Sequence, residues 1–170
     1  GFRYALGMSF SHDASMVACY TSLPEDGVFL YDWMLEQLVQ QVPISIPINH
    51  VSFNPRDSSR VCVTGTDELF EFWHYNKKTS HVAPIRNLPN LDEAGYTVHV
   101  WLESDVVLAG TDDGRAVLVQ GVEVKLVIPV FGPLPGENGL GGNDATEIPV
   151  VSILHRKTSN TIVVFGEDAR

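Results

Sequence analysis

Residues 97–120 read TVHVWLESDVVLAGTDDGRAVLVQ, three apolar runs separated by two short polar clusters. Valine- and leucine-rich runs of this length, set between Gly, Asp and Ser residues, are typical of antiparallel strands joined by hairpins. The pair Asp113-Gly114 supplies the positive φ that a tight hairpin turn requires. The runs are nearly continuous rather than alternating, which predicts strands covered on both faces.

Similar units recur along the chain. Residues 51–73 repeat the pattern as VSFNPRD, VCVTGTD and LFEFW, an earlier copy spans 8–32, and a later copy begins at Val150. The aspartates of the first turn in three copies are 44 and 48 residues apart, at Asp13, Asp57 and Asp105. A period of this length with four strands per repeat is the signature of a β-propeller blade. The sequence therefore predicts an all-β fold made of propeller blades.

Three segments carry a resemblance to WD40 repeats. Residues 109–119, AGTDDGRAVLV, resemble the WD40 pattern S-G-S-D-D-G-x-V-x-L-W. Residues 28–32 (VFLYD) and 70–74 (FEFWH) resemble its V-x-V-W-D strand end, with Tyr for Trp in the first and His for Asp in the second. The Gly-His pair that opens a strict repeat is missing, so the family's Asp-His-Ser/Thr-Trp tetrad is not carried over. The chain resembles a degenerate WD40 β-propeller over nearly its whole length.

A narrower resemblance rests on one blade. Residues 50–57 (HVSFNPRD) and 61–65 (VCVTG) resemble a blade of the WD-repeat cilia- and flagella-associated proteins of the axoneme, as does the passage at residues 30–38. This resemblance implies a non-enzymatic scaffold in the cytoplasm, the cytoskeleton and the axoneme of cilia or flagella. It implies docking of axonemal proteins, such as dynein-anchoring or tether complexes, on doublet microtubules for motility.

The repeats divide residues 1–170 into three and a half to four blades of a larger propeller, because propellers usually close with more blades. The expected blades cover 4–42, 50–86, 96–129 and, incompletely, 148–170. A flexible Gly/Pro-rich loop is expected at 131–147. In the first blade, the spacing of Leu35, Leu38, Val39 and Val42 also fits a short helix, but the repeat favours a strand. The remaining blades or subunits are expected elsewhere, and without them two sheet faces would be open.

Charge and composition bound the classes of partner. The net charge is −10 and the isoelectric point is near 4.8, which disfavours nucleic acid and anionic membranes as direct partners. No apolar run is long enough to span a membrane, and residues 1–20 lack a signal-peptide pattern. Cys19 and Cys62 fall at equivalent places in two repeats and are expected to be buried, reduced thiols of a cytosolic protein.

The residues that could carry chemistry do not form known catalytic or ligand-binding patterns. Residues 139–142 (GLGG) lack the lysine of a phosphate-binding loop, and residues 112–114 lack the spacing of a calcium loop. The six histidines show no metal-ligand spacing. Residues 11–13 (SHD) are adjacent on an expected strand and would point to opposite faces, which excludes a catalytic relay among them. We therefore assign no catalytic, cofactor-binding or metal-binding residues and expect no cofactor.

Two features are candidates for contact with protein partners. The aromatic residues fit either packing between blades or docking from an exposed face; they are Trp33, Trp73 and Trp101, with Tyr31, Phe53 and Phe72. The turns at 56–59 and 112–115 and the loop at 131–147 lie where a propeller meets its partners.

Two other functions compete with the axonemal scaffold. One is a non-ciliary WD40 scaffold in trafficking, ubiquitin ligation or signalling, and only the blade at residues 50–65 argues against it. The other is a propeller enzyme of the quinoprotein or hydrolase kind. Such an enzyme needs acids, histidines or a metal that converge on the central channel, and equivalent blade positions do not supply them.

Overall fold

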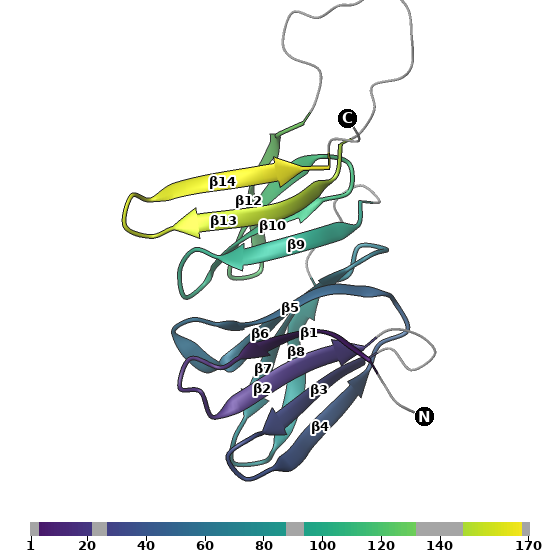
Figure 1. Cartoon of the computed structure of the whole chain (residues 1–170), viewed down its shortest axis with the longest axis vertical. Helices are drawn as coiled ribbons and strands as arrows, with labels where there is room; N and C mark the ends of the chain where they lie inside the picture. Colours follow the sequence, from purple (N-terminus) through teal and green to yellow (C-terminus); the bar gives the residue numbers. More distant parts are fainter. Residues whose placement is uncertain (1–3, 22–26, 88–93, 132–147, 168–170) are drawn as a thin grey trace, which may run out of the picture.

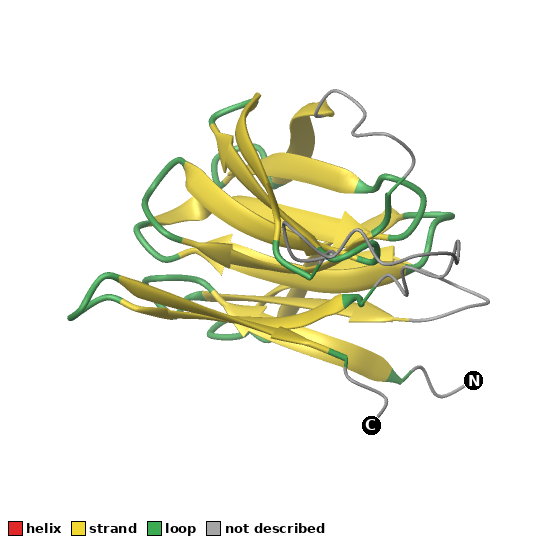
Figure 2. Cartoon of the chain, turned by 90° about the horizontal axis from the view of Figure 1, so that it is seen from above, coloured by secondary structure: helices red, strands yellow, loops and turns green. Residues whose placement is uncertain are grey.

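The computed structural model describes residues 4–21, 27–87, 94–131 and 148–167, and every helix-or-strand element within these ranges is a β-strand (Figure 2). This confirms the predicted all-β class. The strands are β1 (Ala5–Phe10), β2 (Met16–Thr21), β3 (Gly27–Asp32), β4 (Gln37–Pro43), β5 (Ile48–Asn54), β6 (Asp57–Gly65), β7 (Phe70–Asn76), β8 (His81–Asn87), β9 (Tyr96–Trp101), β10 (Val106–Thr111), β11 (Arg115–Gln120), β12 (Glu123–Pro129), β13 (Val150–Arg156) and β14 (Thr161–Gly166).

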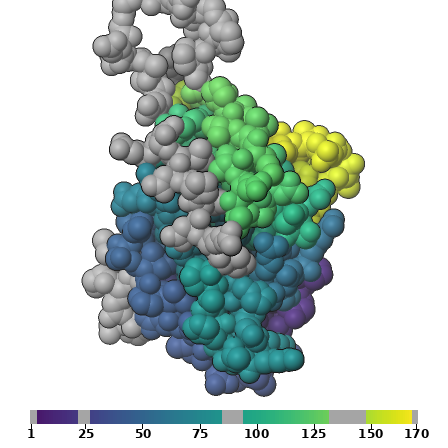
Figure 3. All heavy atoms as spheres, turned by 180° about the vertical axis from the view of Figure 1, so that it is seen from behind, coloured from purple at the N-terminus to yellow at the C-terminus, as the bar shows by residue number. Residues whose placement is uncertain are grey.

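The strands form three four-stranded antiparallel sheets and one two-stranded sheet (Figure 1). Each sheet pairs its strands in chain order: β1 to β4, β5 to β8, β9 to β12, and β13 with β14. We call the three larger sheets the first, second and third blades, and β13–β14 the last hairpin. This arrangement is half of a β-propeller, as the repeats predict. In the space-filling view of Figure 3 the last hairpin (yellow) lies beside the third blade (green).

The segment that opened the sequence analysis forms three strands of the third blade. Strand β10 lies between β9 and β11, and Ala109 is paired with His99 on one side and Val117 on the other. The turn between β10 and β11 is closed at Gly114, whose φ of 82° is unfavourable for other residues. Val107 and Val117 are fully buried because neighbouring sheets cover both faces of this blade. The predicted hairpins are confirmed.

Successive inner strands bring the blades together around a common axis. β1 contacts β5, β5 contacts β9, and β9 contacts β13. Because each blade is an up-and-down meander, its connections alternate between two faces of the propeller. The first face carries the turns β1–β2 and β3–β4 and their equivalents in the other blades, at the left in Figure 1. Among the described residues, the second face carries the turns β6–β7 and β10–β11 and the crossing from β4 to β5.

The core consists of three clusters, each lying between two neighbouring sheets. The cluster between the first and second blades is centred on Leu30, Val51, Val63 and Trp73. The cluster between the second and third blades is aromatic, with Phe70, Phe72, Tyr96 and Trp101. The smallest cluster joins Leu108 and Ala116 of the third blade to Val150 and Ile153 of the last hairpin. A sheet buries its apolar side chains only where a neighbouring sheet covers them. The stability of the fold therefore depends on contact between blades.

The last strand of the first blade is β4, so the strand prediction for this segment is confirmed and the helical alternative is wrong. A β-bulge lies where Leu30 pairs with Gln40 and Tyr31 with Leu38. The extra residue shifts the alternation of side chains. Val39 and Val42, which are three residues apart, therefore both pack on the cluster between the first and second blades. The bulge explains the three-residue spacing of Val39 and Val42, whereas Leu35 and Leu38 are exposed.

Both outer sheets present apolar side chains to solvent, which confirms the expectation of two open faces. Met8 and Phe10 of the first blade are 65% and 55% exposed, and Leu154 and Phe165 of the last hairpin are 58% and 45% exposed. Several exposed apolar side chains thus lie on each of these two sheets. Of the expected loop at 131–147, residues 132–147 lie outside the described residues.

The two cysteines are free thiols with unequal burial. Cys62 is completely buried, as predicted, and burial raises the pKa of its thiol well above the usual value. Cys19 is only half-buried, because it lies on the side of β2 that faces away from the second blade; burial raises the pKa of this thiol as well. The prediction of buried thiols is therefore correct for Cys62 and only partly correct for Cys19.

Val117→Ala is expected to lower the free energy of unfolding by about 2–3 kcal/mol, because it leaves a cavity in a fully packed site between two blades. Val151→Ala removes the same atoms from a position that is 47% exposed and is expected to cost less than about 0.5 kcal/mol. Urea denaturation of both variants measures the difference, and equal losses would contradict this account of the core.

Candidate interaction surfaces

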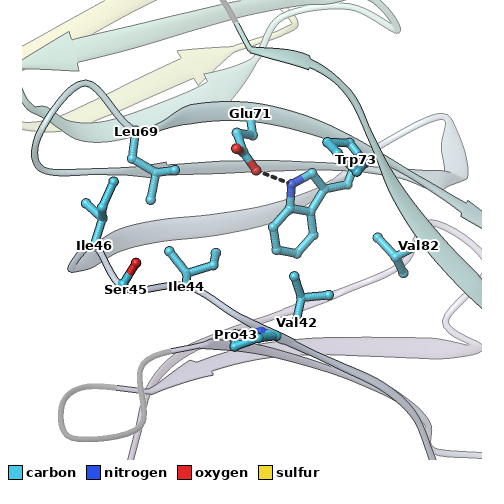
Figure 4. Close-up of a pocket in the computed structure, with 10 residues that line it drawn as sticks. Val42, Pro43, Ile44, Ser45, Ile46, Leu69, Glu71, Trp73 and Val82 are labelled. Atoms are coloured by element: carbon cyan, nitrogen blue, oxygen red, sulfur yellow. Dashed lines mark hydrogen bonds between the residues drawn. The ribbon is translucent and has the colours of Figure 1, made fainter.

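An apolar groove lies between the first and second blades, toward the second face (Figure 4). The crossing segment from β4 to β5 forms one wall, and β7 and β8 form the other. Its volume is about 270 Å³. The lining consists of Val42, Pro43, Ile44, Ser45, Ile46, Leu69, Glu71, Trp73, Val82 and Pro84. The groove is therefore apolar with a single carboxylate.

Glu71 and Trp73 lie on the same side of β7 because side chains alternate along a strand. The indole Nε1–H of Trp73 donates to Glu71 Oε2 at 2.6 Å. Trp73 is 2% exposed, so its N–H would be unsatisfied without this acceptor. Glu71 is half-buried, and Figure 4 shows its carboxylate beside the indole at the edge of the groove.

The outer strands on either side of the groove are joined by a side chain. Gln40 of β4 accepts a hydrogen bond from the backbone N–H of Val82 in β8, at 2.7 Å. This contact satisfies a backbone donor on the outermost strand of the second blade. It also fixes the distance between the two blades at their rim, so the groove has ordered walls.

A buried polar network joins the second and third blades near the axis. The Nε2 atom of His99 lies 2.7 Å from Ser52 Oγ, and its Nδ1 atom lies 2.9 Å from Thr64 Oγ1. Trp101 donates its indole N–H to Ser52 Oγ at 3.0 Å. In either neutral tautomer, one ring nitrogen donates to one of these hydroxyls and the other ring nitrogen accepts from the second. Both ring nitrogens of His99 are thereby satisfied in the neutral form.

His50 lies against this network. Its Nδ1 atom accepts the backbone N–H of His99 at 3.3 Å, and the two rings lie 4.4 Å apart. Burial, and then the nearby His50, hold the pKa of His99 well below its usual range. Burial also lowers the pKa of His50. Protonation of either ring is therefore unfavourable in the folded state.

The turn at 56–59 is part of a bonded structure, with Arg56 exposed at its tip. Asp57 accepts hydrogen bonds from the N–H and Oγ of Ser59 at 2.9 and 2.6 Å. Burial opposes ionisation of Asp57, but these bonds lower its pKa overall. The hydroxyl of Ser58 accepts the backbone N–H of Asp13 from the neighbouring blade at 3.1 Å. The turn thus connects two blades on the first face.

The turn at 112–115 is also internally bonded. Arg115 forms an ion pair with Asp113 at 2.6 Å, and Asp112 accepts the backbone N–H of Gly95 at 3.0 Å. Thr111 Oγ1 accepts the backbone N–H of Arg115 at 2.9 Å. Because it connects β10 to β11, this turn lies on the second face, opposite the turn at 56–59. The two predicted contact turns are not brought together.

The aromatic residues divide between core and surface. Trp73, Trp101, Phe53 and Phe72 are buried between blades, whereas Trp33 and Tyr31 are 48% and 38% exposed. Trp33 donates its indole N–H to the carbonyl of Ala14 and packs edge-on against Phe10, with ring centroids 6.2 Å apart. Packing between blades is therefore confirmed for four of these residues, and docking through the two exposed ones stays a prediction.

Residues 11–13 lie at a turn rather than on a strand, so the reason given for excluding a relay was wrong. Ser11 Oγ donates to Asp13 at 2.8 Å, and Ser15 donates to the same carboxylate through its N–H and Oγ. These hydrogen bonds, led by that from Ser11, lower the pKa of Asp13. Asp13 therefore closes a turn and orients no histidine through these bonds.

The described residues hold no group of three or more His, Cys, Asp or Glu side chains with the geometry of a metal site. In the same part of the chain, no helix is long and apolar enough to cross a lipid bilayer.

Sequence reasoning missed the groove and the histidine network, although each had a signal. Glu71 is the single charged residue in the run LFEFW (69–73), which is unusual for a strand covered on both faces. His50 and His99 occupy equivalent positions when residues 50–53 (HVSF) are aligned with 99–102 (HVWL). Equivalent positions on neighbouring inner strands lie side by side, so the alignment contained the contact.

The free energy of unfolding is expected to depend on pH through His99. Its folded-state pKa lies below the unfolded value near 6.5, so the unfolded chain binds more protons. The stabilisation is fully present above about pH 6.5 and decreases as the pH falls below it. His99→Gln is expected to flatten this slope in urea denaturation between pH 7.5 and 5, whereas Thr79→Gln, which changes no ionisable group and lies in an exposed turn, is the matched control. An equal slope in wild type and His99→Gln would contradict the assignment.

Comparisons with known proteins find a partial sequence match and a match to a solved fold. No protein-family model matches the chain. A 116-residue segment is 27% identical to mouse Cilia- and flagella-associated protein 57, covering 66% of this chain and 9% of that protein. The matched segment is thus a small part of the length of the relative.

The fold has a solved counterpart. The crystal structure of the β-propeller domain of Cps50 (Swd1) from Myceliophteria thermophila superposes with a TM-score of 0.72 at 14% identity. The match covers 95% of this chain and 48% of the solved chain. The chain is therefore distantly similar to Cilia- and flagella-associated protein 57 and has the fold of half a β-propeller.

Proposed function

We propose that the chain is part of a non-enzymatic propeller scaffold that docks other axonemal proteins in a cilium or flagellum. The observation that carries the proposal is the distant homology to a cilia- and flagella-associated protein, together with a fold whose surfaces suit protein contact. The partners would be components of a dynein-anchoring or tether complex on doublet microtubules. The protein would then reside in the cytoplasm, the cytoskeleton and the axoneme.

Rigid blades with several separate surfaces support a docking role. The two turn-bearing faces and the two open apolar sheets point in different directions, and the groove at Glu71 adds a site toward the second face. A scaffold of this kind can hold several proteins at fixed spacing. The high negative charge favours protein partners with basic surfaces over nucleic acid or anionic membrane.

We further propose that the open sheets on the first blade and on the last hairpin are covered by other blades or subunits of a larger assembly. The chain aligns with 48% of a solved propeller chain and so corresponds to about half of a ring, which supports this proposal. A non-ciliary scaffold remains the second candidate. It rests on the fold alone, which serves many docking functions.

The axonemal assignment is tested by locating the tagged full-length protein in ciliated cells, with proximity labelling of its neighbours. We expect the signal to lie along the axoneme, with dynein-associated or tether components among the labelled proteins. A cytosolic or Golgi signal without axonemal neighbours would sink the ciliary assignment and favour a general scaffold.

Coverage of the first blade predicts that one substitution has different effects in two contexts. Met8→Lys is expected to change the free energy of unfolding of the isolated chain by less than about 0.5 kcal/mol, since Met8 is exposed. In the larger assembly the new lysine would be a buried, unpaired charge, which is expected to lower the free energy of unfolding by about 3 kcal/mol. Thr79→Lys, in an exposed turn, is the matched control. Urea denaturation of each variant, in the isolated chain and in the larger assembly, measures the effects. Equal losses for Met8→Lys in the two contexts would mean that the sheet stays open.

A further inference from the structure

The groove between the first and second blades has the size of a site for a side chain. Its volume of about 270 Å³ is slightly below the range of about 300–1,000 Å³ that is usual for small-molecule pockets. Its walls are ordered, because Gln40 joins β4 to β8 beside it. One or two side chains of a partner would fill this space.

The lining is chemically asymmetric. Glu71 is its one acidic residue, and none of the lining residues that the structure describes is basic. Trp73 uses one hydrogen-bonding position on Oε2, and a carboxylate has about four. The remaining positions are beside apolar walls, where water screens a charge less than it does in bulk. A cationic donor at this position would therefore be bound more strongly than at an exposed glutamate.

Two prolines limit how a partner can bind. Pro43 lies at the end of β4, and Pro84 lies within β8, so both walls lack a backbone N–H at these positions. Addition of a partner strand depends on a row of backbone donors and acceptors. The groove therefore favours insertion of a side chain over extension of the sheet.

We propose that this groove binds an arginine side chain of a partner protein, with the aliphatic part on the apolar walls and the guanidinium on the Glu71 carboxylate. Arginine fits better than lysine because its guanidinium is planar, weakly hydrated and able to donate two parallel hydrogen bonds. Its methylene groups pack on apolar surface while the charged end reaches a polar partner. Aliphatic neighbours in the partner would contact Pro43 and Pro84, which are exposed at the rim.

This inference rests on the proposed docking function and names the chemistry of one partner. The test uses purified protein, so a negative binding result would not contradict the axonemal location. Likewise, a non-ciliary location would not contradict binding in the groove.

The experiment titrates ¹⁵N-labelled full chain with the tripeptide acetyl-Val-Arg-Val-amide and follows the indole N–H signal of Trp73 by NMR. Trp73→Phe identifies that signal among the three tryptophans. We expect a saturable shift, because the guanidinium changes the charge on the acceptor of this N–H. The peptide with citrulline in place of arginine has the same shape without charge and is expected to bind at least about tenfold more weakly.

Glu71→Gln is expected to weaken binding of the arginine peptide at least about tenfold, since it removes the charge but keeps an oxygen acceptor for Trp73. Glu103→Gln removes the same charge from an exposed turn on the first face and is expected to bind like wild type. Ser45→Lys serves as a second variant at an exposed lining position. It places an ammonium near Glu71 and is expected to weaken binding to a similar extent.

Four results would overturn the proposal: a shift that never saturates, equal binding of the citrulline peptide, equal binding of a lysine peptide, or unchanged affinity in both Glu71→Gln and Ser45→Lys.

Discussion

Contact between neighbouring blades is the interaction on which this molecule depends. Each sheet has apolar side chains on both faces, and it gains stability only where another sheet covers them. The aromatic cluster of Phe70, Phe72, Tyr96 and Trp101 shows this most clearly, since two of its members come from each of two blades. The polar groups at the same interface are paired as well, through His99, so the blades are held by packing and by specific hydrogen bonds.

Much of the fold could be predicted from the sequence because a propeller repeats one local pattern. The Asp113-Gly114 pair and the turn aspartates Asp13 and Asp57, which are 44 residues apart, belong to that pattern. All three turns occur as expected. Asp105 departs from the pattern, because residue 107 is valine and offers no hydroxyl to a turn aspartate. The bulge in β4 was not predictable, because it depends on pairing with β3 and not on the local run of side chains.

The candidate site was harder to predict, for a physical reason. The groove is made by residues from the crossing segment, β7 and β8, which meet only when two blades stack. A single glutamate in an aromatic strand indicates that a polar side chain is needed at that position. It does not indicate which residues that side chain faces. The turns were easier to locate and proved to be stabilised by their own hydrogen bonds, as at Asp57 and Asp113. Contact of these turns with protein partners stays a prediction.

The contact between His50 and His99 has a consequence for the evolution of such repeats. These two residues occupy equivalent positions on neighbouring inner strands, so a substitution at one of them is constrained by the equivalent position in the next copy. Drift within a blade is therefore coupled to drift in its neighbour. Repeats of this type would diverge from their shared consensus while retaining matched pairs, and covariation at separations near 49 residues would record the order of the blades around the ring.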